Sequence, residues 1–138
     1  MTYGAETWAL TTQAKNMLTA AQTKMERSML NITYRDIKTN TWVREKMKVT
    51  SVIEHVGTRK WIWAGHVSSI RDSRWTLRIT TWKPYERERP RGRPEIRWRD
   101  ELDVYWKDTI WQRIAQDRRM LKQHADAFVQ TWGAMAAQ

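Results

Sequence analysis

The residues of this chain best suited to binding a ligand are arginines and tryptophans, and they gather in one stretch. Residues 59–99 contain twelve Lys or Arg against four Asp or Glu, a surplus of eight within a net charge of +10. Tryptophans 61, 63, 75, 82 and 98 are interleaved with these charges. Guanidinium groups bind phosphates in a forked geometry, and flat aromatic rings stack on bases. The stretch is therefore typical of a nucleic-acid-binding surface, the alternative being a solvated basic surface over a tryptophan-rich core.

One short motif inside this stretch suggests a specific mode of binding. Pro90-Arg91-Gly92-Arg93-Pro94, preceded by Arg89, matches the core of an AT-hook. In such a peptide two arginines enter a narrow A·T minor groove, and the glycine lets the backbone approach the groove floor. Short motifs also match by chance, so general phosphate contact and an ordinary turn before a helix-starting proline remain open.

We rank the candidate contacts by charge and setting. Lys60 to His66 places Trp61 and Trp63 two residues apart, so on a helix they face different sides and one of them could stack on a base. Trp98, between two arginines, is predicted to be a core residue. The predicted nucleic-acid-binding residues are, in order, Arg91, Arg93, Arg89, Arg97, Arg99, Arg71, Arg74 and Lys60, with Trp61 as the stacking candidate.

Catalytic and metal chemistry find little support in the sequence. There is no cysteine, and His55 and His66 are eleven residues apart, which is about 16 Å along a helix and too far to share a metal. Asp100, Glu101 and Asp103 crowd a predicted helix N-terminus, where acids complement the helix dipole without any catalytic role. No phosphate-binding loop, nucleophile elbow or metalloprotease motif is present. We predict no metal, no cofactor and no catalysis by this chain on its own.

Composition limits the class of protein and its surroundings. The 138 residues are 41% hydrophobic and 29% charged, which fits one domain or two small helical ones. No stretch approaches the roughly twenty apolar residues that a membrane-spanning helix requires. The first ten residues do not have the pattern of a signal peptide. An acidic partner, DNA or RNA duplex, and an intracellular, nuclear location are expected, while the oligomeric state is left open.

Hydrophobic periodicity predicts an all-α fold of five or six helices. A helix over 12–30 would bury Ala14, Met17, Leu18 and Met25, and a shorter one over 41–49 would be capped by Asn40. Further helices are expected over 51–69, from residue 72 or 73 until Pro84, from Pro94 onward, and over 109–132.

Three local features of these helices can be tested directly. Ser51 and Glu54 have the spacing of a capping box. Trp75, Ile79 and Trp82 fall at i, i+4 and i+7 and predict a buried helix face, and Gly133 is placed to end the last helix. All three prolines fall within 83–94, so we predict a Pro/Arg loop there, inside a C-terminal module 50–138 that follows an N-terminal helical segment 1–49.

Several short blocks, weak singly, occur in a specific order: YGAETW at 3–8, KMERSML at 24–30, WIWAGHV at 61–67, DSRW at 72–75, GRP at 92–94, RWRDE at 97–101 and AQDR at 115–118. In this order they resemble the C-terminal end of the endonuclease-reverse transcriptase of RTE-type (Bov-B-like) non-LTR retrotransposons, over nearly the whole chain.

The resemblance implies a function and an origin. Residues 1–49 would correspond to the helical thumb, which grips the template-primer duplex, and the remainder to a basic tryptophan-rich region. The endonuclease and the palm, with its metal-binding aspartates, would precede residue 1, so RNA-directed DNA polymerase activity would belong to the parent protein. The expected function is a non-catalytic nucleic-acid-binding fragment of that enzyme. A free-standing or domesticated AT-hook-like DNA-binding protein and an unused transposon relic are the alternatives.

Overall fold

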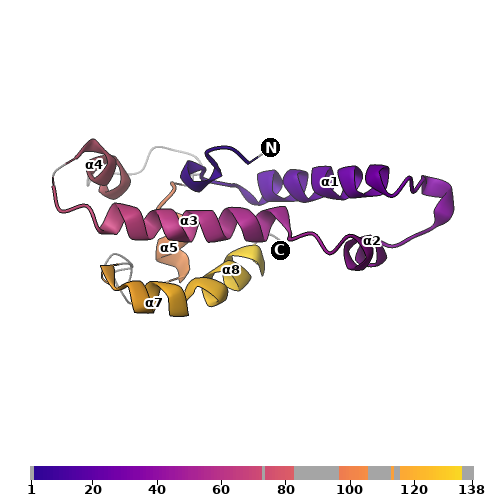
Figure 1. Cartoon of the computed structure of the whole chain (residues 1–138). Coiled ribbons are helices and arrows are strands. Elements are labelled where there is room, and N and C mark those ends of the chain that lie inside the picture. Colours follow the sequence, from indigo (N-terminus) through magenta and orange to yellow (C-terminus); the bar gives the residue numbers. More distant parts are fainter. Residues whose placement is uncertain (1, 73, 83–96, 106–112, 114–115, 135–138) are drawn as a thin grey trace.

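The structure, a computed structural model, describes residues 2–72, 74–82, 97–105, 113 and 116–134. The all-α prediction is confirmed, since every regular element in these ranges is helical (Figure 1). Within them there are seven α-helices, because the described part of the segment predicted as the single helix 109–132 contains two. The elements are η1 Ala5–Thr7, α1 Thr12–Met29, η2 Tyr34–Asp36, α2 Asn40–Met47, α3 Val52–Ser68, α4 Trp75–Thr81, α5 Asp100–Tyr105, α7 Arg118–Gln123 and α8 Ala125–Ala134.

Helix α3 is the centre of the molecule. It contacts η1, α1, α4, α7 and α8, and Figure 1 shows it between α1, η1 and α4 on one side and α5, α7 and α8 on the other. In the core, the Trp61 ring stacks on Phe128 at 4.9 Å between centroids and meets Tyr105 edge-on at 6.4 Å. The buried core cluster comprises Ala5, Leu10, Val52, Ile53, Val56, Trp61, Ala64, Leu102, Phe128 and Trp132.

Two glycines allow α7 and α8 to pack closely on α3. A Cβ on Gly57 would lie 2.9 Å from Cε3 of Trp132, and one on Gly65 would lie 2.5 Å from Cδ2 of Leu121. Glycine in a helix interior costs about 1 kcal/mol relative to alanine. Here that cost is offset by packing, because a larger residue at either position would displace a side chain of the facing helix.

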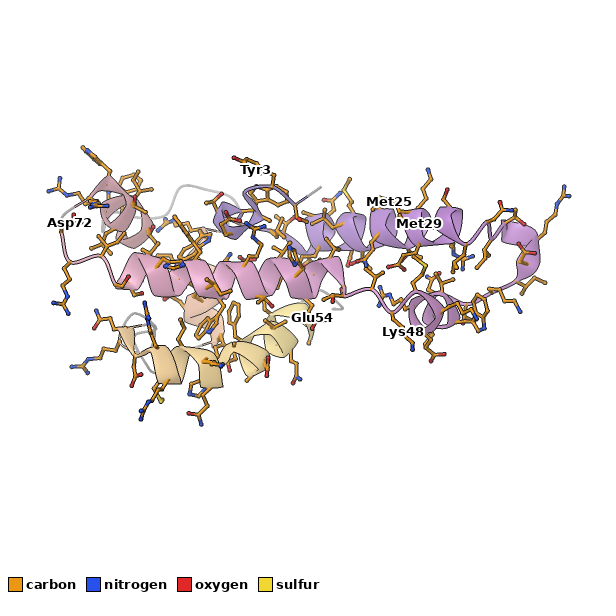
Figure 2. The ribbon with its side chains drawn as sticks, in the orientation of Figure 1. Tyr3, Met25, Met29, Lys48, Glu54 and Asp72 are labelled. Atoms are coloured by element: carbon orange, nitrogen blue, oxygen red, sulfur yellow. The ribbon has the colours of Figure 1, made fainter. Side chains whose placement is uncertain are left out.

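The position of α1 is predicted correctly, but its buried face only in part: Ala14 and Leu18 pack against the core as predicted, whereas Met17 and Met25 do not. Asn31 takes a left-handed conformation (φ 51°), and the Ile32 N–H donates to the Arg27 carbonyl at 2.9 Å, which ends the helix. The exposed residues include Met17, Met25 and Met29, the last two of which are labelled in Figure 2. The buried residues are instead polar, because each has a partner on another element or within α1: Lys15, Gln22, Thr23 and Glu26.

The predicted caps of α2 and α3 are also corrected. Thr39, not Asn40, caps α2, its hydroxyl accepting from the Trp42 N–H at 3.2 Å. The Ser51 side chain makes no capping hydrogen bond. Its role is taken by Gln22 of α1, whose Oε1 accepts from the Val52 N–H at 2.6 Å. A side chain distant in sequence therefore satisfies the first turn of α3.

Three further predictions fail in the C-terminal half. Trp75, Ile79 and Trp82 are 72%, 69% and 64% exposed, so the predicted buried face of α4 is open. Asp117 caps a new helix, accepting from the Arg119 N–H at 2.8 Å, which divides the predicted last helix. Gly133 lies inside α8 instead of ending it.

The two predicted segments contact each other. Ala5 and Leu10 lie in the same core as Val52 and Ile53, and α1 packs on α3. The division at residue 49 stays a prediction, and the loop 83–94, including Pro94, lies outside the described residues. None of the helices in the described ranges is both long and apolar enough to cross a membrane.

Candidate nucleic-acid interface

Lys60 and Trp61, both predicted contacts, lie inside the protein. The Lys60 side chain is fully buried, forms an ion pair with Glu101 and donates to the Trp8 carbonyl at 3.2 Å. Trp61 is 1% exposed, and its indole N–H donates to the Leu121 carbonyl at 2.6 Å. Neither side chain can reach a nucleic acid in this fold, because Trp8 and α5 enclose Lys60, and α7 and α8 cover Trp61.

A buried charge cluster explains why Lys60 is retained in the core. Glu101 lies between Lys60 and Lys15, whose Nζ is 3.9 Å from the carboxylate and 3.8 Å from the centroid of the Trp132 ring. Burial lowers the pKa of Lys60 to about 7, with the charge of Lys15 acting in the same direction and that of Asp100 opposing it. Burial likewise lowers the pKa of Lys15 to about 8. These lysines are structural.

Many of the basic residues of 59–99 pair with carboxylates of the same chain. Among the seven Lys and Arg described in this stretch, Arg59 pairs with Glu6 at 3.3 Å, Arg74 with Asp72 at 2.6 Å, Arg99 with Asp103 at 3.0 Å, and Lys60 with Glu101. The described part of the stretch is therefore less cationic than its composition indicates. Arg71, Arg74, Arg78 and Arg97 are exposed, whereas the Arg99 side chain is only 14% exposed. Arg89, Arg91 and Arg93 lie outside the described residues.

The exposed residues of α4 form one wall of an open hollow of about 580 Å³. Its lining within the described ranges includes two arginines and no carboxylate. Its residues are Trp63, Trp75, Trp82 and Trp98, with Arg97 and Arg99, and with Thr7, Thr76, Ile79 and Thr80. Trp82 and Arg97 are also the last described residues on either side of segment 83–96.

Two tryptophans of this hollow are anchored by the fold. The Trp98 indole N–H donates to the Glu6 carbonyl at 2.7 Å, and Lys60 Nζ lies 5.3 Å from the centroid of its ring. Trp63, on α3, meets His66 edge-on at 6.4 Å. On α4, Arg78 lies 5.6 Å above the Trp75 ring. Sequence reasoning missed this hollow because it assigned Trp75 and Trp82 to the core.

A second basic region lies around α2, at the opposite end of the molecule from α4 (Figure 1). Residues 24–48 contain seven Lys or Arg and three Asp or Glu, one of which, Glu26, is buried. A hollow of about 800 Å³ between α1 and α2 is lined by Lys24, Arg27 and Arg44. Counting charges over residues 24–48 would have revealed this second basic region from the sequence. Its exposed cations are Lys24, Arg35, Lys38, Arg44, Lys46 and Lys48.

The described residues contain no group of three or more His, Asp or Glu side chains that could hold a metal ion. What the fold offers is an all-α scaffold with basic residues at both ends and an open tryptophan hollow at one of them. By its fold and charge, the chain is a small basic helical protein.

Comparison with known proteins supports a transposon origin. The chain is 32% identical over 131 residues to an uncharacterized transposon-derived protein of Caenorhabditis elegans, and the match covers 86% of this chain and 47% of that protein. The chain therefore spans about half the length of the curated relative it matches. No protein-family model matches the chain. No solved structure matches it either.

Proposed function

We propose that this chain is a non-catalytic nucleic-acid-binding segment, from the C-terminal region of an RTE-type retrotransposon reverse transcriptase. The observation that carries the proposal is the presence of exposed cations at both ends of the helical scaffold, around α2 and around α4. The similarity to a transposon-derived protein supports the origin, and the ordered sequence blocks support the family. Catalysis would belong to other parts of the parent protein.

The proposed binding mechanism is electrostatic. Lys38, Lys46 and Lys48 at one end and Arg71 and Arg97 at the other would neutralise phosphates of an RNA/DNA or DNA duplex, releasing condensed counterions. Such contacts position a duplex without reading its sequence. This suits a protein part that holds a template-primer of any sequence.

The proposal predicts measurable and strongly salt-dependent duplex binding. Fluorescence anisotropy with a labelled 20-base-pair DNA duplex and the matching RNA/DNA hybrid, between 50 and 300 mM salt, should give a linear fall of log K with log salt. The slope should be about −0.9 for each phosphate neutralised. Absence of affinity for both duplexes at 50 mM salt would overturn the proposal.

A free-standing AT-hook-like DNA-binding protein is the second candidate, favoured by Pro90-Arg91-Gly92-Arg93-Pro94. Replacing Arg91 and Arg93 with alanine separates the two candidates. Phosphate contact predicts an equal loss of affinity for A·T-rich and G·C-rich duplexes, whereas minor-groove insertion predicts a selective loss on A·T-rich DNA.

A further inference from the structure

We propose that the hollow lined by Trp63, Trp75, Trp82 and Trp98 binds the unpaired bases of a single-stranded nucleic acid. This inference rests on the proposed function and adds to it a ligand class, single strands, and a site for their bases. The argument uses the exposure of α4, the anchoring of the opposite wall, and the local charge.

The α4 side of the hollow exposes more aromatic surface than helix packing explains. Trp75 and Trp82 are 72% and 64% exposed, and Ile79, one helical turn after Trp75, is 69% exposed. Such a contiguous apolar face on the outside of a small protein marks a binding surface. Each tryptophan offers a flat face of the kind on which any base can stack.

The other side of the hollow is held in place by the core. The Trp98 ring is fixed by its hydrogen bond to the Glu6 carbonyl and by the buried Lys60. Trp63 is half-buried on α3, the most contacted helix of the fold. A ring held in this way loses little conformational entropy when a ligand stacks on it, which favours binding.

The charge around the hollow selects an anionic ligand. The charged side chains among the described residues that line it are Arg97 and Arg99, the second of which pairs with Asp103, and Arg78 lies over the Trp75 ring. From 71 to 82 and from 97 to 103 there are five arginines against Asp72, Asp100 and Asp103 and the buried Glu101, so the exposed surface remains positive. An apolar peptide would gain nothing from these guanidinium groups, whereas a nucleotide has a phosphate beside every base.

Single strands fit the hollow better than duplexes do. Bases in a duplex are stacked on one another, and their faces are hidden from a protein side chain. At about 580 Å³ the hollow lies within the usual range of ligand sites, roughly 300 to 1,000 Å³, and it cannot admit a double helix. Aromatic rings beside cationic groups are the usual means of holding single-stranded bases without sequence preference.

The experiment compares two probes and three variants of the full chain. The probes are a fluorescein-labelled ten-nucleotide oligo(dT) and a labelled 20-base-pair duplex. Trp75→Ala/Trp82→Ala should weaken oligo(dT) binding about tenfold or more, as expected for loss of base stacking, and change duplex affinity less than about twofold. Trp75→Phe/Trp82→Phe keeps two rings and should retain most of the affinity. Tyr3→Ala, which removes an exposed aromatic ring that lines neither hollow, is the matched control and should change neither affinity.

Each outcome decides the inference. Unchanged oligo(dT) binding by a folded alanine variant, or equal losses on both probes, overturns it while leaving the proposed duplex binding intact. If the natural chain binds neither probe, both this inference and the proposed duplex binding are overturned. Sedimentation measurements test whether a second copy of the chain occupies the hollow instead. If the natural chain dimerises through α4 and the alanine variant is a monomer that still binds oligo(dT), the hollow is a self-association surface. Should the alanine variant misfold by circular dichroism, a loss of oligo(dT) binding in the phenylalanine variant overturns the inference.

Discussion

At the scale of single residues, Glu101 joins α5 to two other helices through buried charges. It is the acidic partner of Lys15 on α1 and of Lys60 on α3, and all three side chains are buried. Breaking a buried ion pair by removing one partner typically costs 3–5 kcal/mol, because the remaining charge stays in a medium of low polarity. Two lysines would be left in that situation here.

We therefore expect Glu101→Gln to lower the free energy of unfolding by about 3 kcal/mol at pH 6. The loss should shrink by pH 9.5, because the pKa values of Lys60 and Lys15 are about 7 and 8 and both groups are then neutral in the folded protein. Because these values lie below the ordinary 10.5, the folded natural protein binds fewer protons than the unfolded chain between about pH 7 and 10.5, and its own stability should rise across that window.

Urea unfolding at the two pH values measures the effect. Glu54→Gln is the matched control, because Glu54 is exposed and takes no part in the buried charge cluster. It should change stability by less than about 0.5 kcal/mol. If Glu101→Gln lowers the free energy of unfolding equally at pH 6 and pH 9.5, the two lysines keep their protons at the higher pH.

At the scale of elements, helix positions could be predicted from the sequence, whereas the buried face of α4 and much of that of α1 could not. Residues 12–30 and 51–69 were placed within a residue or two of α1 and α3, because apolar spacing and break residues are local signals. The polar face of α1 is buried because Lys15 and Gln22 find partners far along the chain. No local pattern contains that information.

The same limit applies to the candidate site. The count of arginines located the basic stretch 59–99, but helix spacing assigned Trp75 and Trp82 to a core that does not cover them. It also left Lys60 on the surface, because a buried lysine is recognisable only through its partner, Glu101, 41 positions later in the chain.

The link between α1 and α3 gives a test at this scale. Gln22→Ala removes the acceptor of the Val52 N–H and a donor to the Thr50 carbonyl, so we expect a loss of about 2 kcal/mol in the free energy of unfolding. Ser51→Ala should cost less than about 0.5 kcal/mol, whereas a working capping box would cost about 1 kcal/mol. Thermal or urea unfolding of the two variants decides it, and a larger loss for Ser51→Ala would contradict the structure.

At the scale of the whole molecule, the two basic ends are separated by the length of α3, which at 17 residues is roughly 26 Å. A duplex rises about 3.4 Å per base pair, so one of about eight base pairs has a comparable length. If the same duplex contacts both ends, removing the cations of one end should lower the salt dependence without abolishing binding.

Lys38→Ala/Lys46→Ala/Lys48→Ala tests this expectation. It removes three exposed cations near α2, and the slope of log K against log salt should become shallower by up to about 2.7. The matched control is Arg118→Ala/Arg119→Ala/Lys122→Ala, which removes three exposed cations from α7, on the other side of α3 from α4 (Figure 1). Equal slopes for both variants would mean that only total charge matters and that the α2 end is no interface.

The close contacts of Gly57 and Gly65 have a consequence for genome sequences related to this one. Most changes at the first two positions of a glycine codon add a side chain, and at these sites a Cβ meets Trp132 or Leu121. In copies that natural selection has abandoned, both codons should drift as fast as that of Val49, which is 52% exposed. In copies that cells or elements still use, changes at the two glycine codons should be almost entirely synonymous.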